Sequence, residues 1–290
     1  MSSHRPRKRF GQHFLHERGI IQRIVTAFDP KPSDHVVEIG PGEGVLTREL
    51  VGKVARLDVV ELDRDLVTRL RESLPETVTI HSADALKFDF CSLAPHMDVP
   101  VSRETGSRER PPSHGKAQSG HPWPAPLASI PSAKLRVIGN LPYNISTPLL
   151  FHLLDQAHCV GDMLFMLQKE VVDRMVAAPG GKDYGRLSVM LQWGADMEKL
   201  FNVGAGAFRP PPKVDSSVVR LTPHAVPPVE VHDPQRFAAI VKAAFSQRRK
   251  VLRNTLKGLV APETMERLGI DPGRRAETLS LQEFAALSNA

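Results

Sequence analysis

The chain has 290 residues, of which 41% are hydrophobic, so it can bury a core and is not disordered throughout. Its formal net charge of +6 fits a polyanionic partner without proving one. No apolar run is long enough to cross a membrane, and the basic N-terminus lacks the apolar core of a secretory signal. The two cysteines, Cys91 and Cys159, stand far apart with no Cys or His at metal-ligand spacing. We therefore expect a reducing, cytoplasmic location, no disulfide framework and no metal.

Four basic residues gather near the N-terminus at Arg5, Arg7, Lys8 and Arg9. They belong either to a solvated tail or to an arm that binds phosphates. Apolar residues then recur at helical spacing over residues 20–28, and two prolines soon afterwards end the predicted helix.

The first predicted strand, residues 36–39, leads into a glycine-rich turn with Gly40, Gly42 and Gly44 at alternate positions. Such a turn between a strand and a helix lets a ligand approach the backbone closely. The dinucleotide fingerprint needs its third glycine one place later, where this chain has Val45, and the Lys-Ser/Thr of a P-loop is missing. Together with the acidic Glu38 before the turn, this pattern favours an S-adenosylmethionine loop over a nicotinamide loop.

Two more predicted strands end in acidic residues. Glu61 follows the strand at residues 57–60, and its acceptor-only carboxylate suits both hydroxyls of a ribose. Asp63 or Asp65 is available to cap the next helix instead. Asp84 follows the third strand and suits an adenine amine. The glycine turn and these acids, at three successive strand ends, predict one nucleoside-shaped site.

The composition changes between residues 98 and 133, where polar residues, proline and glycine dominate and apolar residues show no periodic spacing. We interpret this segment as a disordered surface insertion. A role in binding a partner, with Trp123 as an anchor, is the alternative.

A buried strand at residues 135–139 leads into Asn140, Leu141, Pro142 and Tyr143. Open α/β sheets carry their chemistry at such carboxyl ends. Asn140 offers an acceptor for one hydrogen of a ring amine, Pro142 stiffens the backbone, and Tyr143 can stack on the ring. The alternative is an ordinary turn with Tyr143 in the core.

A proline-rich stretch follows Phe208 and runs into a strand-like segment at residues 217–221. We interpret it as a rigid loop beside the site, rather than as a ligand for an SH3-type partner, and expect it to present Phe208 as a second stacking surface. The alternative places Phe208 in the core.

The C-terminal part has a helical pattern, and no acid interrupts its positive charge from Lys242 to Lys257. One expected apolar face consists of Val241, Phe245, Leu252, Leu256 and Leu259. Basic residues lie at many of the positions outside this apolar face and include the predicted RNA-binding residues Arg248, Arg249, Lys250 and Arg253. The choice is between a solvated face and a phosphate-backbone contact, and the nucleoside site favours the second.

Taken together, these motifs resemble those of the small-subunit ribosomal RNA adenine dimethyltransferase family. The resemblance rests on residues 9–15 (Arg-Phe-Gly-Gln-His-Phe-Leu), 38–42, 61–63, 84–85, 140–146, 167–171, 184–188, 208–216 and 245–250. The Gly-Gln-His-Phe-Leu and Asn-Leu-Pro-Tyr blocks are specific, whereas the glycine turn is common to most methyltransferases.

The resemblance implies an α/β fold: a Rossmann-like, S-adenosylmethionine-dependent methyltransferase domain with a mainly parallel sheet, over residues 1–225, and a small helical RNA-binding domain over 226–290. Its implied cofactor contacts are His13, Leu15, Gly40, Gly42, Glu61, Asp84 and Asn140. Its implied catalytic residues are Asn140, Leu141, Pro142, Tyr143 and Phe208. Some relatives have asparagine in place of His13, and the 98–133 insertion departs from the compact pattern.

The implied reaction is dimethylation of the exocyclic amines of two adjacent adenines near the 3′ end of small-subunit (16S) rRNA, coupled to subunit biogenesis. The partner is rRNA within a precursor subunit, and the protein is expected to be a monomer that binds neither membrane nor DNA. Two alternatives remain: a large-subunit adenine dimethyltransferase of the macrolide-resistance type, and a non-catalytic assembly factor. A DNA adenine methyltransferase is disfavoured because no target-recognition domain is apparent.

Overall fold

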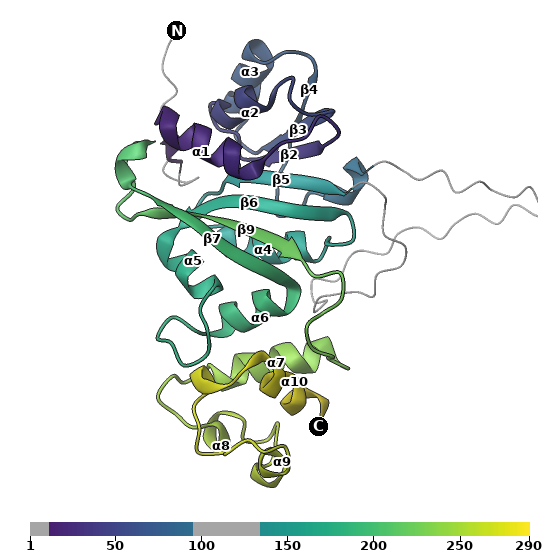
Figure 1. Ribbon diagram of the computed structural model, residues 1–290, viewed down its shortest axis with the longest axis vertical. Helices are drawn as coiled ribbons and strands as arrows, with labels where there is room; N and C mark the ends of the chain where they lie inside the picture. The colour runs from purple at the N-terminus through teal and green to yellow at the C-terminus, as the bar shows by residue number, and fades with distance from the viewer. Residues whose placement is uncertain (1–11, 95–133) are drawn as a thin grey trace, which may run out of the picture.

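The computed structural model describes residues 12–94 and 134–290 (Figure 1). Its main sheet contains β2 (His35–Ile39), β3 (Arg56–Glu61), β4 (Val78–Ser82), β5 (Leu135–Asn140), β6 (Val160–Gln168), β7 (Ala195–Val203) and β9 (Ser216–Pro223). The strand order within the described ranges is β4-β3-β2-β5-β6-β9-β7. The first five strands in this order pair in parallel, and β9 pairs antiparallel with both β6 and β7. The predicted α/β fold with a mainly parallel sheet is confirmed.

Helices cover both faces of this sheet, as a parallel sheet requires. One face carries α1 (Arg18–Phe28) and α2 (Val45–Leu50), whose buried residues Phe28 and Leu50 pack with Val36 of β2. The other face carries α4 (Ser146–Leu154), α5 (Lys169–Met175) and the 3₁₀ helix η2 (Phe90–Leu93), packed against Val37. Helix α3 (Arg64–Ser73) connects β3 to β4. Adjacent valines thus serve opposite faces, because successive side chains in a strand point to opposite sides.

The C-terminal helices form a separate cluster at one end of the molecule (Figure 1). They are α7 (Pro234–Ala244), α8 (Leu252–Thr255), α9 (Pro262–Arg267), η4 (Ala276–Thr278) and α10 (Leu281–Asn289). Helix α6 (Arg186–Gly194) joins this cluster to the sheet, since Leu191 packs toward the sheet whereas Trp193 contacts Phe237 of α7, with ring centroids 4.9 Å apart. The domain boundary near residue 225 remains a prediction, and it falls between the end of β9 and the start of α7.

The helical pattern expected across Lys242–Lys257, with one continuous apolar face, is wrong in that the helix is interrupted. Helix α7 ends at Ala244, a turn follows, and α8 begins at Leu252. Val241, Leu252 and Leu256 all belong to the C-terminal cluster, and the turn between α7 and α8 brings them together. Leu259 is 43% exposed and does not belong to the expected apolar face.

The expectation of no disulfide is also wrong. Cys91 of η2 and Cys159, just before β6, are bonded with an Sγ–Sγ distance of 2.05 Å. Their separation of 68 residues concealed this contact, because η2 and the end of α4 cover the same face of the sheet. Residues that are far apart in the sequence can lie close in space where the connections between parallel strands pack side by side.

Two predicted segments lie outside the described residues: the basic arm at Arg5 to Arg9 and the whole of the 98–133 insertion. Within the described part of the chain, no helix is long and apolar enough to span a membrane.

A buried carboxylate generates a prediction about acid stability. Asp58 of β3 is 0% exposed and accepts hydrogen bonds from His35 and His81, each at 2.7 Å, and also contacts Arg56. Burial alone would raise the pKa of Asp58, but these hydrogen bonds outweigh it and lower the pKa from 3.8 to about 2. A depressed pKa stabilises the fold above the unfolded value, and this contribution disappears as the pH falls through the folded value.

We therefore expect Asp58→Asn to lower the free energy of unfolding by about 2 kcal/mol near neutral pH. The deficit should shrink as the pH falls from about 4 to about 2. Urea unfolding across this range measures it, with Asp196→Asn, an exposed strand residue, as the matched control. A deficit that does not change with pH would contradict the role of the ionised carboxylate.

Candidate active site

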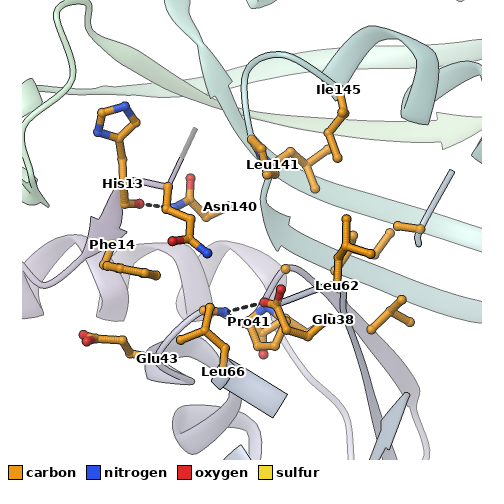
Figure 2. A pocket seen from close by; sticks show the side chains of 18 of the residues that line it. His13, Phe14, Glu38, Pro41, Glu43, Leu62, Leu66, Asn140, Leu141 and Ile145 are labelled. Carbon is orange, nitrogen blue, oxygen red and sulfur yellow. Dashed lines mark hydrogen bonds between the residues drawn. The ribbon is translucent and has the colours of Figure 1, made fainter. Parts of the chain in front are cut away.

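A pocket lies at the carboxyl ends of four neighbouring parallel strands, β2, β3, β4 and β5. Its walls come from the turns that follow these strands and from the N-terminal segment at residues 12–15 (Figure 2). The predicted cofactor residues all line it: His13, Leu15, Gly40, Gly42, Glu61, Asp84 and Asn140. Leu141, Pro142 and Tyr143 line it as well. The structure therefore brings together almost all of the predicted site, although their roles remain predictions.

The turn after β2 depends on glycine. Gly40 and Gly42 adopt φ values of 66° and 59°, in the left-handed region that residues with a Cβ rarely occupy. A Cβ on Gly42 would also lie 3.0 Å from the ring of Phe14, which lines the pocket beside it. Any side chain at this position would strain the turn and displace the N-terminal segment.

Glu61 is held in place by backbone donors. Its carboxylate accepts the N–H of Asp63 at 2.8 Å and that of Gly42 at 3.3 Å, so it connects the end of β3 to the glycine turn. Burial raises the pKa of Glu61, and the hydrogen bonds to Asp63 and Gly42 oppose this rise. Of the two alternative capping residues, Asp63 is the N-cap of α3, because its side chain accepts the N–H of Asp65.

Glu38 lies deeper, at 1% exposure, and accepts a 2.6 Å hydrogen bond from the hydroxyl of Thr47. Burial raises the pKa of Glu38 from 4.5 to about 7, with the nearby charge of Glu61 adding to the rise. Two carboxyl groups thus share one wall of the pocket. On the β4 side, Asp84 accepts the N–H of Leu86 at 3.0 Å.

The orientation of Asn140 follows from its partner. Its Nδ2 donates to the carbonyl oxygen of His13 at 3.0 Å, and a carbonyl can only accept (Figure 2). The side-chain oxygen of Asn140 is therefore the atom available as an acceptor on the other side of the amide. This is the atom that the proposed amine recognition needs.

Tyr143 and His13 line the pocket side by side. The two rings are stacked, with centroids 5.7 Å apart and planes at 26°. The Tyr143 hydroxyl shares a 2.8 Å hydrogen bond with Ser216, and burial raises the pKa of this hydroxyl. His13 Nδ1 lies 2.8 Å from the carbonyl oxygen of Pro210, so Nδ1 carries a proton. Both rings are thus held by the segment that runs from the end of β8 to the start of β9.

Phe208 does not present its ring to the pocket as expected. It is 2% exposed and packs in the core cluster that contains Leu15 and Val218. The reason is a two-stranded sheet in which β1 (Phe14–Leu15) pairs with β8 (Phe208–Arg209), with Leu15 opposite Phe208. His13, which we expected to contact the cofactor, is the ring that faces Tyr143. No local sequence signal predicts this pairing.

The predicted RNA-binding residues lie outside the pocket. Arg248, Arg249 and Lys250 are exposed on the turn after α7, and Arg253 is exposed on α8. Arg248 donates to the carbonyl oxygen of Lys182 at 2.7 Å, which anchors the turn to the loop before α6. Sequence reasoning also missed Gln12, whose side chain donates to Asp63 at 3.1 Å and ties the N-terminal segment to the β3 wall.

Comparison with known proteins gives consistent matches. A family model described as ribosomal RNA adenine dimethylase matches residues 3–290. The chain is 51% identical to the ribosomal RNA small subunit methyltransferase A of Laribacter hongkongensis, over 100% of this chain and 97% of that protein. It is 50% identical to the protein of the same name from Pseudomonas aeruginosa, over 99% and 94%. A dimethyladenosine transferase structure from Plasmodium falciparum shares the fold, with a TM-score of 0.71, 23% identity and coverage of 95% and 96%.

The raised pKa of Glu38 predicts a particular dependence of stability on pH. Between pH 4.5 and about 7 the folded chain holds a proton that the unfolded chain has lost, so stability falls as the pH rises through this window. Glu38→Gln removes this effect. The decline in unfolding free energy from about pH 5 to about pH 8 should become smaller by about 3 kcal/mol in the variant.

Urea unfolding at the two pH values measures the difference. Glu43→Gln, which alters an exposed carboxylate of the same turn, is the matched control and should decline as the unmodified protein does. An equal decline in Glu38→Gln would show that Glu38 is not the group that titrates.

Proposed function

The chain belongs to the ribosomal RNA adenine dimethylase family, and from this premise we propose that it transfers methyl groups from S-adenosylmethionine to adenine amines of small-subunit rRNA. One observation carries the proposal: the acidic residues Glu61 and Asp84 line one pocket together with Asn140 and Tyr143. The substrate assignment rests on relatives that are 50% and 51% identical to this chain over nearly their whole length. The name of these relatives specifies the small subunit. This favours the small-subunit over the large-subunit alternative.

The residues of the inner pocket suit the adenosine part of the cofactor. Glu61 is held by two backbone donors, and an ionised carboxylate can accept hydrogen bonds from both ribose hydroxyls. Asp84, on the neighbouring strand end, is the proposed acceptor for the adenine amine. The left-handed turn at Gly40 and Gly42 leaves the backbone accessible to the rest of the cofactor. When bound, S-adenosylmethionine supplies an electrophilic methyl group on a sulfonium with a neutral leaving group.

Positioning of the target amine is the protein's main contribution. The lone pair of an adenine amine is delocalised into the ring, which makes the nitrogen a poor nucleophile. The Asn140 side-chain oxygen and a backbone carbonyl beside Pro142 accept the amine hydrogens and favour a more tetrahedral nitrogen. Leu141 is 1% exposed, so it anchors this turn in the core. After transfer, the nitrogen releases its extra proton.

Tyr143 provides a stacking surface for a base that has left its helix. The hydrogen bond to Ser216 fixes the ring, so little conformational freedom is lost when a base binds. The face of the ring also favours the positive charge that develops on the base.

The exposed cations Arg248, Arg249, Lys250 and Arg253 are the proposed contacts to the rRNA backbone. The net charge of +6 supports such a contact. The finer proposal is that a monomeric, cytoplasmic protein modifies two adjacent adenines near the 3′ end of the rRNA within a precursor subunit.

Asn140→Ala tests the proposed amine recognition. We expect methyl transfer to unmethylated small subunits to fall by about 100-fold, since one positioned acceptor is lost from the reacting nitrogen. Affinity for S-adenosylmethionine, measured by calorimetry on the same preparation, should change by less than about threefold. An equally large loss of cofactor affinity would contradict this role, because Asn140 would then act mainly in binding the cofactor.

Two substitutions of Tyr143 separate stacking from hydrogen bonding. Tyr143→Phe keeps the ring and loses only the bond to Ser216, so transfer should stay within about threefold of the unmodified rate. Tyr143→Ala removes the stacking surface, worth about 1–3 kcal/mol per base, and should lower transfer by about 10-fold or more. Single-turnover rates on unmethylated subunits measure both variants. Equal losses in both would contradict stacking as the role of this ring.

A further inference from the structure

A second group of reactive side chains lies apart from the pocket. Cys91, His158 and Cys159 bring their sulfur and imidazole nitrogen atoms within 4.8 Å of one another. His158 Nε2 is 3.1 Å from Cys91 Sγ, and the two sulfurs are bonded. None of the three lines the pocket.

The two sulfurs have different surroundings. Cys159 is 2% exposed and belongs to the core cluster on this face of the sheet. Cys91 is half-buried, and its neighbour His158 is exposed to solvent. A protonated imidazole beside a thiol stabilises the thiolate, which is the form that attacks disulfides. Access to solvent and the imidazole nitrogen 3.1 Å away therefore both single out Cys91 as the sulfur that reacts with external molecules.

We propose that Cys91, with His158 beside it and Cys159 behind it, forms a thiol–disulfide exchange site for small disulfides such as glutathione disulfide. The Cys91 thiolate attacks one sulfur of the small disulfide, forms a mixed disulfide and releases one thiolate. The Cys159 thiolate then attacks Cys91 Sγ, closes the internal bond and releases the second thiolate. The chain loses two protons and two electrons, and the small disulfide is reduced to two thiols.

The bond joins two segments that lead away from the pocket. η2 follows the Asp84 wall along the chain, and Cys159 follows α4, which begins at the end of the Asn140–Ile145 wall. Oxidation closes a loop with a sequence separation of 68 residues, which restricts the unfolded chain. Its main expected effect is therefore on stability.

Hydrogen bonds dock the same two segments without the disulfide. Gln156 accepts the N–H of Phe90 at 2.7 Å and donates to the carbonyl oxygen of Phe88, which also lies 2.8 Å from His152 Nε2. Reduction should therefore leave the pocket assembled. The Cys91–Cys159 disulfide thus forms and breaks reversibly within a structure that is already folded.

Trapping with glutathione disulfide tests the proposal. The reduced full-length protein is exposed to the reagent and followed by intact-mass measurement. Cys159→Ser should accumulate one glutathione on Cys91, Cys91→Ser should stay unmodified on the same timescale, and the unmodified chain should end in the internal disulfide. Equal labelling of Cys159 in Cys91→Ser would overturn the proposal.

The role of the imidazole has its own control. His158→Gln should slow labelling of Cys91 in the Cys159→Ser background by about 10-fold, because it removes the imidazole nitrogen 3.1 Å from the Cys91 sulfur. His232→Gln, at another exposed histidine, should leave the rate unchanged. Equal rates in the two variants would overturn the assistance by His158.

Formation of the Cys91–Cys159 disulfide should also change the melting temperature. Oxidation should raise the melting temperature of the unmodified chain by about 5 °C and leave that of the Cys91→Ser/Cys159→Ser double variant unchanged. Reduced protein that instead retains stoichiometric Zn²⁺ and resists oxidation would overturn exchange in favour of a metal site at the same three residues.

Discussion

The close parallel pairing of β2 with β5 is the constraint on which the site depends. It places the glycine turn that follows β2 beside Asn140, which ends β5. Gly139 makes this approach possible, because a Cβ at that position would lie 2.5 Å from the carbonyl oxygen of Ile39. Any larger residue would push the strands apart and separate the wall proposed for the cofactor from the turn proposed for the target amine.

The N-terminal segment completes this arrangement from outside the sheet. The carbonyl oxygen of His13 accepts a hydrogen bond from Asn140, Gln12 donates to Asp63, and Leu15 pairs with Phe208. A short stretch of chain thus links the ends of β3 and β5 to the loop before β9. Because the amide of Asn140 is oriented by a backbone carbonyl, its acceptor is set before any substrate arrives, which is the preorganisation that a positioning mechanism needs.

Local patterns in the sequence were sufficient for the parallel strands and for most of the pocket, but they did not predict the edge strand β7. Apolar runs predicted the parallel strands, and the residues directly after them, such as Gly40, Glu61 and Asp84, met at one edge as parallel topology requires. Features set by contacts between distant segments were missed. Phe208 is buried because β8 pairs with β1, the basic helix breaks because its two halves share one cluster, and Cys91 meets Cys159 through packed crossovers. No periodicity within a single segment contains this information.

Transfer of labelled methyl groups to unmodified small ribosomal subunits tests the central claim most directly. The purified protein is incubated with labelled S-adenosylmethionine and these subunits, with large subunits and duplex DNA in parallel. The account predicts label as dimethyladenine in the small-subunit rRNA alone. Tight binding to the small subunits without any transfer would contradict it, and the catalytic roles of Asn140 and Tyr143 would then have to be withdrawn.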